Sequence, residues 1–139
     1  MRNGNSSVKP PALPLVSIIT PSFNQAAYLE ATVQSVLGQD YPNIEYIIID
    51  GGSTDGSVDI IKKYEGRIAS WVSEPDKGQT DAINKGFARA KGDILAWLNS
   101  DDTYHHPKAV GEAALFLMEN PDVAMVYADC DFIDERGRA

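Results

Sequence analysis

The chain has 139 residues, of which 43% are hydrophobic and 23% charged, a composition typical of one globular domain with its own core. Its formal net charge of −8 argues against a nucleic-acid-binding surface, because contacts with phosphates require clustered Lys and Arg. A nucleotide ligand is compatible with this charge, since a divalent cation can bridge carboxylates and phosphates. The single cysteine, Cys130, provides neither a disulfide framework nor a zinc-site spacing.

The chain divides into a short leader and one domain. Residues 1–14 are polar and then rich in proline, which predicts a flexible leader, and residues 15–139 are predicted to form the domain. The sequence contains no run of about 18 apolar residues and no apolar signal-peptide core. We therefore expect a cytoplasmic protein, with any membrane association provided by the rest of a longer parent chain.

Apolar strand patterns alternate with helical patterns along the domain. The first strand is predicted at residues 15–20, and Asn24 can cap the helix that follows at residues 25–37. The remaining elements continue this order, with strands at 44–50, 68–73, 94–99 and 123–129, and helices at 57–64, 79–90 and 108–120. Continuously apolar strands predict an α/β fold, a mostly parallel sheet with helices on both faces. Residues 132–137 have the pattern of a strand entering a turn, so we expect a domain truncated at its C-terminus.

Acidic residues follow most of the predicted strands. In open α/β sheets ligands bind at the carboxyl ends of the strands, so the residues there are candidate site residues. The first strand ends in the uncharged residues Thr20, Pro21 and Ser22. The other four strand ends carry carboxylates: Asp50, then Glu74 and Asp76, then Asp101 and Asp102, then Asp129 and Asp131.

Asp101 and Asp102 are adjacent and follow a buried strand. Neighbouring carboxylates repel one another and need a counter-charge. Oxygen ligands without His or Cys favour a hard cation, so this pair predicts a site for Mg²⁺ or Mn²⁺ that also holds substrate phosphates. The alternative is that one of the two caps a helix. His105 and His106 follow the pair, but adjacent histidines in a loop are usually exposed to solvent.

Asp50 ends the second strand beside Gly51 and Gly52. Its carboxylate can accept hydrogen bonds from a base or ribose that approaches the bare glycine backbone. The alternative is a simple Asp-Gly turn. Asp55, later in the same loop, is expected to cap the second helix.

No phosphate-binding loop follows any strand, because the sequence has neither a Walker motif nor G-x-G-x-x-G. A P-loop nucleotidase or a dinucleotide-dependent dehydrogenase would need one of them. A diphosphate would therefore be bound through the cation, with help from Lys77 or Lys85.

Four ordered motifs resemble family 2 glycosyltransferases, whose fold is called GT-A. VSIITPSFN (residues 16–24) is similar to the opening strand of that family, and YIIIDGGSTDG (residues 46–56) to its second strand and acidic loop. DKGQTDAINKG (residues 76–86) and GDILAWLNSDD (residues 92–102) resemble the third helix and the metal-binding strand end. The resemblance covers roughly residues 15–134 and implies inverting, metal-dependent sugar transfer in cell-envelope polysaccharide biosynthesis.

The resemblance also implies a role for individual residues. The nucleotide, typically UDP with its uracil on Asp50, would be bound by Thr20, Pro21, Ser22, Asp50, Gly51, Asp81, Lys85, Asn99, Ser100 and Asp101. Residues 99–102 occupy the position of the family's Asp-x-Asp motif, so Asp101 and Asp102 would bind the Mn²⁺ or Mg²⁺ ion. Asn99 replaces the first acid of that motif, which leaves either Asp101 or Asp102 as the main metal ligand.

The general base of inverting members is expected beyond residue 139, so Asp129 and Asp131 are poor candidates for it. A glycan or lipid-linked acceptor would be bound by the missing C-terminal half, and this chain alone is expected not to transfer sugar. It would then act as a nucleotide- and metal-binding module. A receiver-like signalling domain would need an acidic pair after the first strand, and a nucleotidyltransferase a Gly- and Arg-rich loop there. The sequence has neither.

Overall fold

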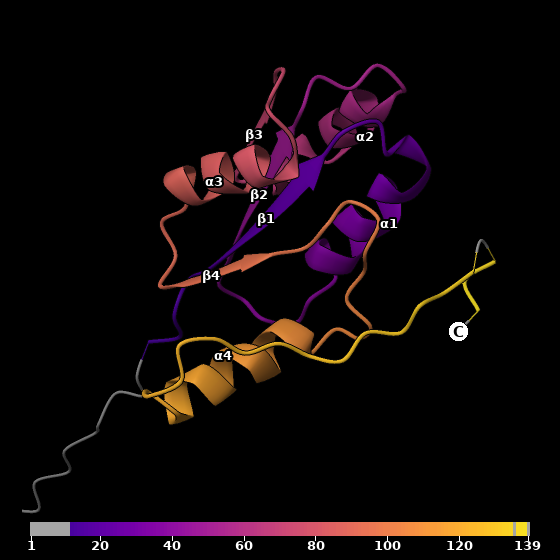
Figure 1. Ribbon diagram of the computed structural model, residues 1–139. Helices are drawn as coiled ribbons and strands as arrows, with labels where there is room; N and C mark the ends of the chain where they lie inside the picture. Colours follow the sequence, from indigo (N-terminus) through magenta and orange to yellow (C-terminus); the bar gives the residue numbers. More distant parts are fainter. Residues whose placement is uncertain (1–11, 135, 139) are drawn as a thin grey trace, which may run out of the picture.

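A computed structural model describes residues 12–134 and 136–138. Four parallel strands form one sheet in the order β3-β2-β1-β4, with helices between them in the chain (Figure 1). In chain order the elements are β1 (Val16–Ser22), α1 (Ala26–Leu37), β2 (Ile44–Asp50), α2 (Ser57–Lys63), a 3-10 turn η1 (Glu65–Arg67), β3 (Ser70–Ser73), α3 (Gln79–Arg89), β4 (Ile94–Trp97) and α4 (Ala109–Glu119).

The two central strands are covered by helices on both faces, which explains their continuous apolar sequences. Every residue of β1 is buried, as are the last five of β2. On one face, Ile18 and Ile48 pack with buried residues of α1, α2 and α4. On the other face, Ile19 and Ile47 pack against Ala82 of α3. The predicted α/β class, with a parallel sheet and helices on both faces, is therefore confirmed.

The predicted strand at residues 123–129 is wrong. In the part of the chain that the structure describes, residues 121–134 form no strand, and Tyr127 and Phe132 are 86% and 89% exposed. Their apolar pattern suits a strand, but a strand exists only when a neighbour pairs with its backbone. The strand expected at 132–137 is likewise absent from the residues of that range that the structure describes, although its turn forms: the Gly137 N–H donates to the Asp134 carbonyl at 2.8 Å.

Several element boundaries differ from those predicted. β1 continues to Ser22 because Ser22 pairs with Asp50 at the end of β2. β3 and β4 are shorter than predicted, with four residues each. Residues 1–11 of the predicted leader lie outside the described residues. Leu13 is anchored to the domain, since its carbonyl accepts a hydrogen bond from Asn43 at 3.0 Å.

Asn24 does not cap α1, contrary to prediction. It has a positive φ of 51° and exchanges hydrogen bonds with the next loop, its Oδ1 accepting from the Thr54 N–H at 2.9 Å. None of the helices described in the structure is long and apolar enough to cross a membrane.

Candidate nucleotide and metal site

The carboxyl ends of β1 and β4 lie side by side at the point where the strand order reverses. β1 connects to β2 on one side, whereas the chain crosses from β3 to β4 on the other side of β1. Such a reversal leaves a crevice in which open α/β sheets bind ligands. The sheet thus brings Ser22, at the end of β1, between Asp50 at the end of β2 and the residues that follow β4.

Residues Asn99–Asp102, hereafter the acidic turn, follow β4 after one intervening residue, Leu98. The Asp102 N–H donates to the Asn99 carbonyl at 3.1 Å, and the Asn99 amide donates to the Asp102 carboxylate at 3.1 Å. Asp101 and Asp102 are exposed, while Ser100 is buried. Neither acid caps a helix, because α4 begins only at Ala109.

The donor set of the acidic turn suits a hard divalent cation. Its exposed oxygens come from two carboxylates, and Mg²⁺ is commonly bound by one or two carboxylates plus substrate phosphates. Among the residues described, no three carboxylate, imidazole or thiol groups gather closely enough to hold a metal ion. A cation bound by these two carboxylates would take its other ligands from phosphate oxygens.

The end of β1 contributes Ser22 but not Thr20. The Ser22 hydroxyl is buried and has no hydrogen-bond partner within residues 12–134 and 136–138. The Thr20 hydroxyl lies 3.0 Å from the Tyr46 hydroxyl inside the sheet, and burial raises the pKa of Tyr46 far above its usual value. Thr20 is therefore a core residue, and Ser22 is the polar group that this strand leaves for a ligand.

Asp50 is fully buried and holds its own loop together. Its carboxylate accepts the N–H groups of Gly52 at 3.1 Å and Ser53 at 2.8 Å. It also accepts the hydroxyls of Ser53 at 2.5 Å and Ser73, on β3, at 2.6 Å. The turn that the sequence left as an alternative is thus present, extended by the contact with β3.

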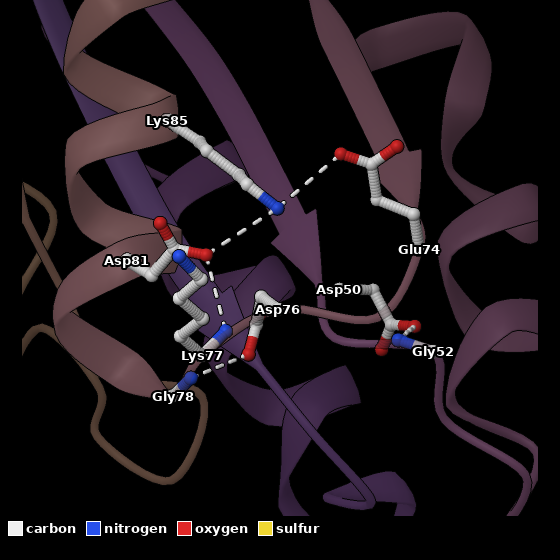
Figure 2. A network of polar contacts seen from close by, with 8 residues as sticks. All are labelled: Asp50, Gly52, Glu74, Asp76, Lys77, Gly78, Asp81 and Lys85. Atoms are coloured by element: carbon white, nitrogen blue, oxygen red, sulfur yellow. Dashed lines mark hydrogen bonds and ion pairs between the residues drawn. The ribbon is translucent and has the colours of Figure 1, made fainter.

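Asp81 and Lys85 fasten α3 to the end of β3 (Figure 2). Lys85 Nζ lies 3.5 Å from the Asp81 carboxylate and 3.3 Å from that of Glu74. Asp81 accepts the N–H of Lys77 at 3.1 Å, and this hydrogen bond lowers the pKa of Asp81. The pairs are partly exposed, so solvent screens them and they contribute little to stability. Lys85 therefore has local partners and does more than solvate a helix face.

Two contacts near the site were not predicted from the sequence. Gln79, the first residue of α3, donates its amide to Asn99 Oδ1 at 2.6 Å. Asp76 lies against Gly51, where an added Cβ would come within 2.9 Å of its carboxylate. Asp76 was recognised as an acidic strand end, but its contact with Gly51 depends on how the two loops pack.

Residues 105–106 form a separate group beside α4. His106 Nδ1 accepts the N–H of Lys108 at 3.1 Å, and His106 Nε2 lies 3.6 Å from Glu112. Asp129 and Asp131 are exposed outside the sheet, so the edge loses the acidic end of the predicted fifth strand. Two hollows in the described part of the chain also lie elsewhere, around Tyr41 and around Tyr104. The candidate site therefore rests on the chemistry of the carboxyl edge.

Asp55 links the starts of two helices. Its carboxylate accepts the N–H and hydroxyl of Ser57 at the start of α2, as expected, and also the N–H of Ala26 at the start of α1. The hydrogen bond from the Ser57 hydroxyl, followed by that from Ala26, lowers the pKa of Asp55.

We expect the Asp55→Asn variant to be less stable at neutral pH and less sensitive to acid. A carboxylate with a lowered pKa stabilises the fold fully above its unfolded pKa of about 4, and this contribution is lost as the pH falls through the lower folded value. Urea midpoints between about pH 7 and about pH 3 should therefore decline less steeply in the variant. Equal slopes for variant and parent would contradict this role.

The fold and the acidic edge define an open, parallel α/β domain of the type that binds nucleotides at its carboxyl edge. The family model of Glycosyl transferase family 2 matches residues 17–138, and the chain belongs to this family. The family membership that the four sequence motifs implied is thus confirmed.

Relatives and solved structures agree with this assignment. An uncharacterised glycosyltransferase of Mycobacterium tuberculosis is 48% identical over 115 residues, covering 82% of this chain and 44% of the relative. TuaG of Bacillus subtilis is named as a glycosyltransferase of teichuronic acid biosynthesis. It is 45% identical over 109 residues, which cover 76% of this chain and 43% of TuaG. The chain thus spans less than half the length of these curated relatives.

Two solved structures share the fold. One is a mannosyltransferase from Pyrobaculum calidifontis in complex with GDP-Man and Mn²⁺. It matches with a TM-score of 0.71 and 26% identity, and the match covers 78% of this chain and 33% of the mannosyltransferase. The other is TarS from S. aureus in complex with UDP-GlcNAc. It matches with a TM-score of 0.70 and 25% identity, and the match covers 77% of this chain and 32% of the TarS chain. The predicted GT-A fold is confirmed by these two likenesses.

Proposed function

We propose that this chain is the donor-binding part of an inverting glycosyltransferase that takes a sugar from a UDP-sugar in the presence of Mn²⁺ or Mg²⁺. The observation that carries the proposal is the position of the acidic turn, exposed beside Ser22 where the strand order reverses. Support comes from the two similar structures, one with GDP-Man and Mn²⁺ and one with UDP-GlcNAc.

In this proposal Asp101 and Asp102 hold the cation, which when bound neutralises the negative charge of the leaving diphosphate. Asn99 and Ser100 orient the ribose beside them. Ser22 offers the nucleotide a hydroxyl that is otherwise unpaired in the described part of the chain. Asp81 and Lys85 serve the diphosphate indirectly, because their ion pair fastens α3, whose first residue contacts Asn99.

Asp50 and Gly51 are proposed to bind the base. The Asp50 Oδ1 atom accepts a single hydrogen bond, from Ser53, whereas Oδ2 accepts three. Oδ1 therefore has acceptor capacity left for the N–H of a uracil, and the Asp76 carboxylate, which lies against Gly51, would move aside to admit the base.

We expect the Asp50→Asn variant to weaken UDP binding by about tenfold while binding of Mn²⁺ persists. Asn keeps the size of Asp, and its oxygen, in the place of Oδ2, can accept the loop N–H groups and the Ser73 hydroxyl, while the Ser53 hydroxyl rotates to accept from its amide. Its NH₂ group would then replace the acceptor needed by uracil. Calorimetric titration with UDP and with Mn²⁺ separates the two effects, and unchanged UDP affinity would reduce Asp50 to its loop contacts.

The acceptor and the general base are assigned in this proposal to chain beyond residue 139. Inverting transfer needs a bound donor, a positioned acceptor hydroxyl and a base near the anomeric carbon. The acidic turn and Asp50 supply only the first, so the chain alone is proposed to bind donor without transferring sugar to a glycan or lipid-linked acceptor. The name of TuaG supports a role in cell-envelope polysaccharide biosynthesis.

A thermal-shift experiment tests the proposed function. UDP with Mn²⁺ should raise the melting temperature, since a ligand at a hundredfold excess over its dissociation constant adds about 2.7 kcal/mol of stability. UDP with a chelator should add little. GDP and dTDP provide matched tests of base selectivity. Equal stabilisation by UDP with and without chelator would contradict the metal dependence, and no stabilisation by any nucleotide would contradict donor binding.

A further inference from the structure

Thr32, in the middle of α1, contacts the acidic turn through its hydroxyl. The side chain is completely buried, and its hydroxyl shares its one proton between the carbonyl of Ser100, 2.9 Å from Oγ1, and that of Asp102, 2.8 Å from Oγ1. A threonine hydroxyl inside a helix usually bonds to a carbonyl of the preceding turn of its own helix. Here it is directed to a segment that follows β4 and runs alongside α1 (Figure 1).

The two carbonyls that accept this hydroxyl lie on either side of Asp101. Fixing both of them against α1 restricts the backbone of Asp101, whose side chain is exposed. Gln79 holds the same turn from the opposite face of the sheet through Asn99. The turn is therefore fastened by one helix from each side, and Thr32 is the contact that fixes its two inner carbonyls.

Two further residues make polar contacts farther from the turn: Ser35 on α1 and Gln39 just beyond the end of α1. The Ser35 hydroxyl accepts the N–H of Tyr104 at 3.2 Å, and Gln39 accepts the N–H of Val110 at 3.0 Å. These contacts guide the chain from the acidic turn into α4. Thr32 differs from both because its partners belong to the acidic turn itself.

We propose that Thr32 is a positioning residue for the cation site: its hydroxyl fixes the carbonyls of Ser100 and Asp102, and thereby the direction of the Asp101 carboxylate. This inference rests on the proposed function for its ligand, the cation bound with a nucleoside diphosphate. Groups that orient metal ligands without touching the metal commonly change metal affinity by 10- to 100-fold when they are removed.

The test compares Thr32→Val, which keeps the shape of the side chain without its hydroxyl, with Thr32→Ser, which keeps the hydroxyl. Thr32→Ala, a better helix former, is a second variant without the hydroxyl should the valine variant fail to fold. Ser17→Ala is the matched control, because Ser17 is equally buried and its hydroxyl bonds to Glu45 and Gly92 at the opposite end of β1.

Two measurements follow each variant: amide hydrogen exchange of residues 101–104 without ligand, and calorimetric titration with UDP at a fixed Mn²⁺ concentration that does not saturate the parent. Loss of the hydroxyl should speed exchange and weaken Mn²⁺-dependent UDP binding by about tenfold each. Thr32→Ser should restore both to within about twofold of the parent, and Ser17→Ala should change neither by more than about twofold.

Unchanged exchange in the variants without the hydroxyl would overturn the proposal, because the turn would then be fixed without Thr32. Faster exchange with unchanged UDP and Mn²⁺ affinity would also overturn it, since Thr32 would hold the loop but not direct the metal ligand. A parent chain that binds no UDP would refute the proposed function instead. The exchange comparison alone would then decide whether Thr32 fixes the turn.

Discussion

The double variant Asp101→Asn, Asp102→Asn is expected to lose Mn²⁺-dependent UDP binding by at least about a hundredfold. Residues that only orient metal ligands account for 10- to 100-fold effects, so removal of both charged ligands should reach or exceed that range. The fold should survive, because both side chains are exposed and replacing them relieves mutual repulsion. Calorimetric titration with UDP and Mn²⁺ measures the effect, and urea denaturation checks the fold.

Asp122→Asn is the matched control for this variant. Asp122 is also exposed but lies beyond α4, away from the carboxyl edge of the sheet. It should leave UDP binding within about twofold of the parent, since distant exposed charges are largely screened. The two single variants show which carboxylate is the main ligand. If the double variant binds UDP and Mn²⁺ as the parent does, the cation site lies elsewhere.

Replacing Gly86 by Ala should destabilise the domain by about 2 kcal/mol. Gly86 is the point of closest approach between α3 and β1, where an added Cβ would lie 2.4 Å from Cγ2 of the fully buried Ile19. Ala improves helix propensity by about 1 kcal/mol, but overpacking of a tight core costs about 1–3 kcal/mol and must also displace α3. Urea denaturation measures the difference in unfolding free energy.

Gly111→Ala is the control for helix propensity alone. Gly111 lies within α4, and a Cβ there would be in ordinary contact, 3.7 Å from the nearest atom. This variant should be neutral or more stable by up to about 1 kcal/mol. Equal effects of the two substitutions would show that the contact with Ile19 does not limit the position of α3.

The regular part of the fold was predictable because its signals are local. β1 and β2 are continuous runs of β-branched and apolar residues, and glycines follow α1 and β2, so the alternation alone indicated a parallel sheet. That order of elements also brought the acidic turn to the edge of the sheet next to the end of β1. The predicted binding edge followed from these two facts.

The predictions that failed depended on contacts between distant segments. Residues 123–129 have an apolar pattern, but the sequence of a segment does not reveal whether a neighbouring strand is available to pair with it. Asn24 was expected to cap α1, whereas Asp55, from the loop after β2, contacts the start of that helix. Thr32 had no sequence signal, since the hydroxyl of a threonine in a helix ordinarily bonds to a carbonyl of the same helix.

The most direct test of the central claim is to locate the bound cation by nuclear magnetic resonance. A ¹⁵N-labelled chain would be titrated with UDP and Mg²⁺, and Mn²⁺ would then replace Mg²⁺, because its unpaired electrons broaden the signals of nearby amides. The account predicts that broadening begins at residues 99–102 and at Ser22, with the amides of residues 105–106 and of α4 affected later. Broadening centred on residues 74–78 or on residues 105–106, with the acidic turn unaffected, would contradict it.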